Sequence, residues 1–269
     1  MHSPAKVALM AALFTTFASL LPNIAQAIKP VTPEAEAATT TSAASSDRLF
    51  FKATEAYEKG DFSAAAQGFY ALLTSGQEGA GIWYNLGNSY YRSGQNGAAL
   101  WAFKEASRLA PRWDNLEANL ALLKLKAIDE LPPLHATWQR TIFFWHYVFS
   151  FKERLILLAI FNALFWALLI ISARKKSDLL SMATIFALAF TLAFGASLIK
   201  EQFFTTPEGV VKTPSVTVRS AGLSTAQALF ELHECTELFV EEEQNGWLLI
   251  SLSDGKRGWV NEEAIAWRR

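Results

Sequence analysis

Two long runs of apolar residues, 155–171 and 179–199, stand in the middle of the chain with a short polar break between them. An α-helix needs about 20 mostly apolar residues to cross the hydrocarbon core of a bilayer. With short flanks both runs are long enough, so we predict transmembrane helices over residues 153–172 and 179–199, joined by a loop over residues 173–178. The alternative is a buried helical hairpin in a soluble core, which the lack of a polar stripe in either run disfavours.

The residues around this hairpin predict where it begins and how it is oriented. Ser150 and Glu153 have the spacing of a capping box, which marks the start of a helix. Arg174, Lys175 and Lys176 lie in the loop, and clustered basic residues in a short loop mark the cytoplasmic side. We therefore expect the segments before and after the hairpin to lie outside the cytoplasm.

Residues 1–27 have the order of a signal peptide. A short basic head precedes an apolar run that is too short to cross a membrane comfortably, and the segment ends in Ala25-Gln-Ala27. We predict cleavage after Ala27, and the alternative is an uncleaved anchor helix. Residues 28–46 are rich in Ala, Thr, Ser and Pro, and this composition predicts a disordered tether.

Residues 47–130 follow a helical pattern that repeats every 34 positions. The tetratricopeptide signature is carried by Trp83, Leu86, Gly87, Tyr90, Ala99, Phe103 and Pro111. One period earlier the match is weaker, because Lys52 and Gln77 stand at two signature positions. We predict two helix pairs, residues 47–79 and 80–113, and a capping helix over residues 114–129. An array this short leaves an end surface that a partner protein or the membrane segment should cover.

The resemblance to tetratricopeptide repeats implies a peptide-binding groove lined by the first helix of each pair. The candidate groove residues are Phe50, Thr54, Tyr57, Tyr84, Asn85, Asn88, Tyr91, Arg92 and Asn119. The tyrosines of this groove favour an apolar peptide or one of mixed polarity. Asn115 and Asn119 stand where carboxylate-binding repeats carry basic residues, so we do not expect a carboxylate clamp. For Tyr84 and Asn85 the alternative is a purely structural role in the repeat.

Residues 131–151 combine a Pro-Pro break with a dense set of aromatic side chains directly before the first apolar run. Aromatic residues next to a membrane-spanning helix suit the headgroup region of a bilayer. We predict an interfacial helix on the outer membrane surface. The alternative is a third buried helix that packs on the repeats.

The tail, residues 208–269, changes to short strand-like runs separated by turn signals at residues 244–246 and 253–255. Five such runs predict a small barrel. The stretches around Val218, Trp247 and Trp259 resemble a bacterial SH3-type domain. Cys235 stands where that family usually has glycine, so we expect a strained turn and a partly exposed thiol.

Chemistry-bearing residues are sparse in the sequence. The single cysteine excludes an internal disulfide, and the four histidines are scattered. A Cys-His pairing of His233 with Cys235 is disfavoured because the two side chains sit poorly for proton transfer to each other. No basic patch suits nucleic acid, and no metal, cofactor or enzymatic motif is apparent. We expect a binding protein rather than an enzyme.

The predicted fold class is multidomain, with an all-α tetratricopeptide solenoid, a two-helix transmembrane hairpin and a small all-β SH3-like barrel. This order resembles the BatE-like proteins of the bacterial aerotolerance (Bat) operon. The resemblance implies an inner-membrane adaptor with both soluble domains in the periplasm, working beside von Willebrand A-domain Bat proteins and a MoxR-type ATPase system. The alternative is a peptidoglycan-binding module in which the barrel recognises the wall and the repeats act as a spacer. Trp247 and Trp259 are the alternative partner-binding residues on the barrel. The net charge of −4 over residues 208–269, from six basic and ten acidic residues, slightly disfavours an anionic wall polymer.

Overall fold

The computed structural model describes residues 33–268 apart from 136 and 176. The chain divides into two units, residues 1–48 and 49–269. The predicted signal peptide, residues 1–27, lies outside the described residues. The first described helix, α3 (Pro33–Glu58), includes residues that we predicted to be a disordered tether. Its sequence explains the difference, because proline suits the first position of a helix and the alanines and glutamates that follow favour helix formation.

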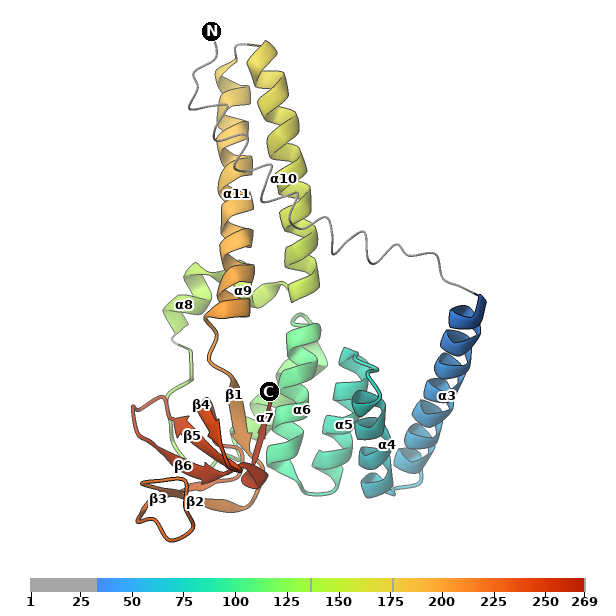
Figure 1. The fold of residues 1–269 in the computed structure, drawn as a ribbon, viewed down its shortest axis with the longest axis vertical. Helices are drawn as coiled ribbons and strands as arrows, with labels where there is room; N and C mark the ends of the chain where they lie inside the picture. The colour runs from blue at the N-terminus through green and yellow to red at the C-terminus, as the bar shows by residue number, and fades with distance from the viewer. Residues whose placement is uncertain (1–32, 136, 176, 269) are drawn as a thin grey trace. The chain divides into compact units, whose positions relative to one another are not determined.

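Four helices follow α3, and consecutive ones pack side by side (Figure 1). They are α4 (Phe62–Thr74), α5 (Ala80–Arg92), α6 (Asn96–Leu109) and α7 (Asp114–Lys124). We call them, with the end of α3, the helix array. The same turn closes α3 and α5, since Gly60 and Gly94 have φ angles of +83° and +81° and donate to the carbonyls of Tyr57 and Tyr91. A left-handed residue at a helix end is most easily supplied by glycine.

Small residues let the helices of this array approach closely. A Cβ atom added at Gly87 of α5 would lie 2.7 Å from the ring of Phe103 on α6. A Cβ added at Gly68 of α4 would lie 2.7 Å from the Cβ of Ala53 on α3, and Ala53 stands 34 positions before Gly87. Ala53 and Gly87, at corresponding positions of the two helix pairs, therefore each make a close contact with the following helix.

Two long helices, α10 (Phe151–Arg174) and α11 (Asp178–Phe203), lie side by side as an apolar hairpin (Figure 1). The predicted capping box is confirmed, because the Ser150 hydroxyl accepts from the Glu153 amide and the Glu153 carboxylate accepts from the Ser150 amide. By length and composition both helices can cross a membrane. In the most apolar 18-residue stretch of α10 only 6% is buried, and in that of α11 only 28%. The core helix of a soluble protein is mostly buried.

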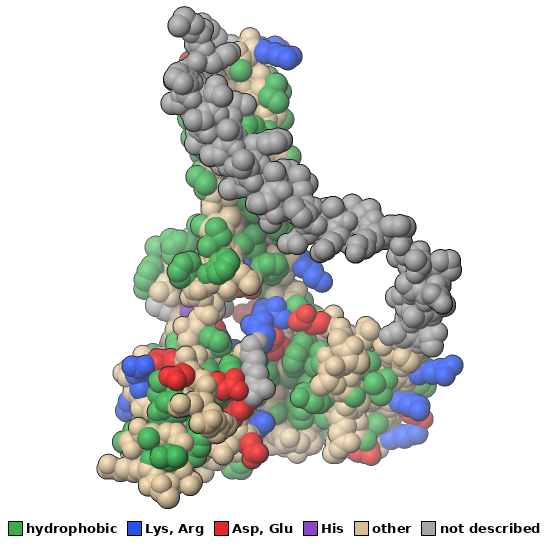
Figure 2. Space-filling view, viewed as in Figure 1, with side chains coloured by type: hydrophobic (Ala, Val, Ile, Leu, Met, Phe, Trp, Pro, Cys, Tyr) green, Lys and Arg blue, Asp and Glu red, His purple; other side chains and the backbone are tan. Residues whose placement is uncertain are grey.

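The aromatic segment before the hairpin forms two short helices, α8 (Thr137–Ile142) and α9 (Phe144–Val148), where we predicted one. Trp138, Ile142 and Phe144 are each more than half exposed. Figure 2 shows hydrophobic side chains gathered over α8 and α9. The alternative of a buried helix packed on the repeats is therefore wrong, and the segment presents a broad apolar surface.

The tail forms one antiparallel sheet in the order β3-β2-β6-β5-β4-β1-β7, and its two end strands are not paired with each other. The strands are β1 (Glu208–Val211), β2 (Ser215–Arg219), β3 (Ala228–His233), β4 (Glu237–Gln244), β5 (Trp247–Ser251), β6 (Arg257–Asn261) and β7 (Ile265–Trp267). Five of these were predicted, whereas β1 and β7 were missed because runs of four and three residues show too little alternation. Asn245 and Gly246 both have positive φ, as a two-residue hairpin turn requires.

Candidate functional site

Two of the predicted groove residues, Tyr84 and Tyr91 of α5, lie against α7. The ring of Tyr84 stacks on that of Trp113 with centroids 4.8 Å apart, and the Lys126 ammonium lies 4.5 Å from the centre of the Tyr91 ring. Both tyrosines are half-buried against the hydrophobic cluster that α6 and α7 share. They therefore help to hold the helix array together. For Tyr84 this agrees with the structural alternative given above, whereas Tyr91 was predicted only to line the groove.

The other groove residues form two further groups. On α3, Phe50 meets the ring of Phe69 edge-on at 5.6 Å and Tyr57 meets that of Phe62 at 5.3 Å, while the Thr54 hydroxyl donates to the Phe50 carbonyl. The guanidinium of Arg92 lies over the same Phe62 ring, at 4.4 Å. The remaining three are amides that stay half-buried without being part of an aromatic contact: Asn85, Asn88 and Asn119.

On the sheet, the alternative site residues Trp247 and Trp259 lie on neighbouring strands. Trp259 pairs with Leu249, two positions beyond Trp247, so both indoles occupy the face opposite the sheet core. The loop between β2 and β3 passes close to them, because a Cβ added at Gly222 would lie 3.2 Å from each tryptophan. The rings are half-buried by this loop and offer only part of their surface to a ligand.

A set of half-buried ion pairs, which the sequence did not predict, joins α6 to the sheet. The Lys104 ammonium lies 2.7 Å from the Glu208 carboxylate and 2.6 Å from that of Glu237. Burial opposes ionisation of Glu208, but a hydrogen bond from His135 and the charge of Lys104 outweigh it and lower the pKa of Glu208 to about 2. The same two carboxylates outweigh the effect of burial on Lys104 and raise its pKa.

We call the contacts that join α6 and the residues after α7 to the sheet the junction. Besides the ion pairs, it contains hydrogen bonds and a close approach of two backbone segments. The Asp129 carboxylate accepts from the His233 amide at 2.8 Å and from the Thr236 hydroxyl. The amide of Gly97, in the first turn of α6, donates to Glu234 at 2.9 Å. A Cβ at Gly97 would lie 2.1 Å from the Val211 carbonyl oxygen, so only glycine fits there. The end surface of the helix array is thus covered by the sheet, rather than by a second protein or by the hairpin as we expected.

Cys235 lies within this junction and is 3% exposed, so the prediction of a partly exposed thiol is wrong. Its φ angle is +70°, which confirms the strained turn predicted for a position where glycine is usual. Burial, together with the nearby Glu234, raises the pKa of the Cys235 thiol to about 12. The Nδ1 of His233 donates to the Asp129 carboxylate, 2.9 Å away. A thiol so hard to ionise is a packing residue.

A polar network ties α9 to one end of the apolar hairpin. Arg154 of α10 is 3% exposed, and its Nη1 lies 2.8 Å from Ser197 Oγ and 2.9 Å from His146 Nδ1. Its Nη2 donates to the Glu201 carboxylate of α11. Burial and the Arg154 charge lower the pKa of His146 to about 4, so its imidazole is neutral and accepts from the arginine.

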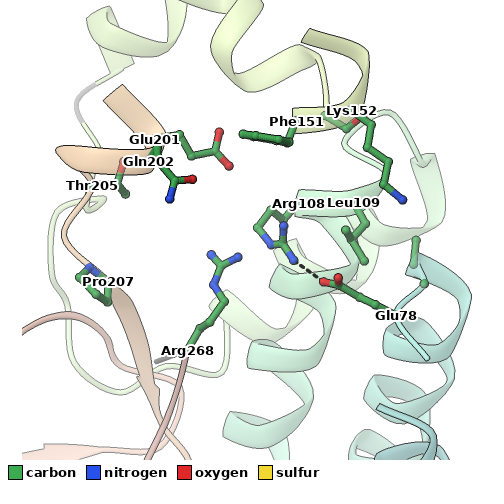
Figure 3. A pocket seen from close by; sticks show the side chains of 13 residues that line it. Glu78, Arg108, Leu109, Phe151, Lys152, Glu201, Gln202, Thr205, Pro207 and Arg268 are labelled. Carbon is green, nitrogen blue, oxygen red and sulfur yellow. Dashed lines mark hydrogen bonds and ion pairs between the residues drawn. The ribbon is translucent and has the colours of Figure 1, made fainter. Parts of the chain in front are cut away.

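A cavity of about 720 Å³ lies at the same end of the hairpin (Figure 3). Its walls come from the start of α5, the end of α6, the first turn of α10, the last turn of α11 and the segment after β7. Five charged residues line it: Glu78, Arg108, Lys152, Glu201 and Arg268. Within the described residues, no group of three or more histidine, cysteine, aspartate or glutamate side chains could hold a metal ion.

Comparison with known proteins adds no assignment. No model of a protein family matches the chain, and no curated protein matches it.

Proposed function

We propose that this chain is a membrane-anchored adaptor of the bacterial envelope that binds partner proteins outside the cytoplasm. In this proposal α10 and α11 cross the inner membrane, and the helix array and the sheet both lie in the periplasm. The partners are other envelope proteins, in a Bat-type complex with von Willebrand A-domain proteins and a MoxR-type ATPase system. The observation that carries the proposal is a short helix array with a 34-residue recurrence, attached to two helices apolar enough to span a bilayer.

The assignment of the array to tetratricopeptide repeats is supported by its corresponding contacts. Gly60 and Gly94 make the same left-handed turn, and Ala53 and Gly87 make the same close approach to the following helix. A repeat array stacks one such unit on the next. The assignment of the sheet to an SH3-like barrel is supported by its short antiparallel strands and by one shared core.

A binding role agrees with the chemistry of the described residues. Cys235 is buried with a raised pKa, and His233 faces Asp129. The half-buried charges at Lys104, Glu208 and Glu237 pair with one another in a junction between two parts of the chain. These groups stabilise the fold, so recognition of a partner falls to the surface of the helix array.

Asn85, Asn88 and Asn119 are the groove residues best placed to contact an extended peptide. Each side chain is half-buried, and an amide can both donate to and accept from a peptide backbone. The tyrosines beside them act mainly through packing on α7. We therefore assign peptide contact to the three amides and a supporting role to Tyr84 and Tyr91.

Orientation in the membrane can be tested with a reporter that is active only outside the cytoplasm. We expect activity when it is fused after Arg269 or inserted near Gly76, and none when it is inserted at Lys175. Activity at Lys175 would overturn the proposed arrangement.

Partner binding can be tested by placing a photocrosslinking residue at position 88 and, as the matched control, at Gln67, an exposed position on α4. In intact cells, we expect position 88 to capture specific envelope proteins that position 67 does not. A crosslinker at Trp247 that recovers wall fragments, with no protein captured at position 88, would favour the peptidoglycan-binding alternative instead.

A further inference from the structure

The cavity beside the apolar hairpin lies where lipid headgroups would be found. Phe151 and Lys152 come from the first turn of α10, and Gln202 comes from the last turn of α11, so both walls are ends of candidate membrane spans. Phe203 and Phe204, next to Gln202, are 74% and 75% exposed. Aromatic side chains at the end of a span are typical of the interface between hydrocarbon and water.

The charges around the cavity leave an excess of positive charge. Arg108 binds the Glu78 carboxylate at 2.6 Å and that of Glu105 at 3.2 Å. Glu201 is neutralised by Arg154. Both acidic residues of the lining are therefore already paired with arginines.

Lys152 and Arg268 are the cations that remain for a ligand. Lys152 is exposed, and the ion pairs of the described residues do not include it. Arg268 makes a long ion pair with Glu105, at 3.8 Å, but Glu105 is already paired with Arg108 and the distance is too long for a hydrogen bond. The N–H groups of the Arg268 guanidinium therefore stay available to a ligand. Figure 3 shows this guanidinium directed toward the side of the cavity that carries Gln202.

The size of the cavity fits a headgroup better than a bare ion. A volume of about 720 Å³ lies within the range of about 300–1,000 Å³ that small-molecule sites occupy. A phosphate alone would fill a small part of it, whereas a phosphate with its glycerol would fill more. Guanidinium groups bind phosphate oxygens in pairs, and a lysine adds a point charge.

We propose that this cavity binds the phosphate of an anionic membrane lipid. Lys152 and Arg268 pair with the phosphate oxygens, the Gln202 amide donates to the headgroup, and the acyl chains lie along the exposed apolar faces of α10 and α11. The inference rests on the proposed membrane anchoring. It adds that the bound lipid bridges the hairpin and the segment after β7.

Native mass spectrometry of the full chain in detergent tests this proposal, with phosphatidylglycerol and phosphatidylcholine of identical acyl chains as probes. We expect phosphatidylglycerol to bind at least about fivefold more tightly, since each basic residue near a headgroup contributes about 1 kcal/mol. The double variant Lys152→Gln and Arg268→Gln should lose this preference. Lys200→Gln is the matched control, because Lys200 is an exposed cation near the end of α11 that does not line the cavity. Inorganic phosphate should not displace the lipid.

Three results would overturn the proposal. They are equal binding of the two lipids, an equal loss of preference in Lys200→Gln, which would indicate diffuse surface charge, and displacement by inorganic phosphate, which would indicate a site for soluble anions. Thermal unfolding checks that the double variant is folded. If alkaline carbonate releases the chain from membranes, the proposed anchoring fails; if the chain stays but lacks a lipid preference, only the lipid site fails.

Discussion

The two faces of the helix array differ in the role that the sequence predicted for them and in the role that they have in the structure. The face formed by α5 and α7 was predicted to be an open groove, yet Tyr84 and Tyr91 are half-buried there against Trp113 and Lys126. The face formed by α6 received no predicted role, yet it carries a half-buried cation paired with two carboxylates of the sheet and a glycine in contact with strand backbone. Residue type alone therefore does not separate a binding surface from an internal junction.

The difference lies in how far apart the contacting residues are in the chain. Tyr84 and Trp113 both lie within one predicted helix pair, residues 80–113, so a repeat signature already places them in one local unit. Lys104 and Glu237 are separated by the whole apolar hairpin, and no local pattern relates them. We expect the α6 face to contribute more than the α5 and α7 face to the stability of the fold.

The largest effect should come from Lys104→Met, which leaves the half-buried carboxylates of Glu208 and Glu237 without their shared cation. Removing one partner of a fully buried ion pair typically costs about 3–5 kcal/mol. We expect about 3 kcal/mol, the lower end of that range, because the Glu208 and Glu237 side chains are 26% and 19% exposed and His135 and Lys124 remain nearby. Thermal unfolding of the purified chain measures this loss. The exposed Lys59→Met is the matched control and should change little. Equal effects of the two substitutions would contradict a stabilising junction.

Gly97→Ala should be the next most damaging change, because its Cβ would collide with the Val211 carbonyl and push β1 away from α6. Overpacking of this kind costs about 1–3 kcal/mol. Gly81→Ala in α5 is the control, since a Cβ there meets nothing within 4 Å and alanine favours helix. Melting temperatures should move in opposite directions, and a tolerated Gly97→Ala would mean that the sheet does not approach α6 so closely.

Tyr84→Ala should destabilise the α5 and α7 face by about 1–2 kcal/mol, because stacked aromatic pairs contribute about 0.5–1.5 kcal/mol beyond their buried area. Asn88→Ala should leave stability unchanged within about 0.5 kcal/mol while weakening partner capture. Unfolding curves and pull-downs of both variants separate packing from recognition. Strong destabilisation by Asn88→Ala would place it among the packing residues.

The smallest effect should be a pH dependence at His233. Its hydrogen bond and charge interaction with Asp129 raise the pKa of His233 above its ordinary value of 6.5. A raised pKa stabilises the fold below that ordinary value, and the stabilisation is lost as the pH rises through the folded-state pKa. The melting temperature of the unmodified chain should therefore exceed that of His233→Gln at about pH 6, and the gap should narrow by about pH 9. A gap that widens with pH would contradict this assignment.

Local signals predicted the local structure well. The capping box at Ser150, the two apolar helices and the Asn245-Gly246 turn are each determined by residues a few positions apart, and the structure agrees. α7 ends at Lys124, earlier than predicted, and Asp129 beyond it is bound to the sheet. Other features bring together segments that lie more than 70 positions apart in the chain. These are the junction, the burial of Cys235 and the cavity, and short-range sequence patterns could not predict them.

The way the sheet covers α6 has a consequence for how the protein is made. Leu100 of α6 and Val210 of β1 share one hydrophobic cluster, although 110 positions of chain, including the whole hairpin, separate them. At about 5–20 residues per second, the ribosome needs about 5–20 s to supply that stretch. During this time the array would expose Leu100 and its neighbours to solvent. A chain exported as we propose must therefore keep an unfinished apolar surface from aggregating until both helices have been inserted and its last strands have emerged.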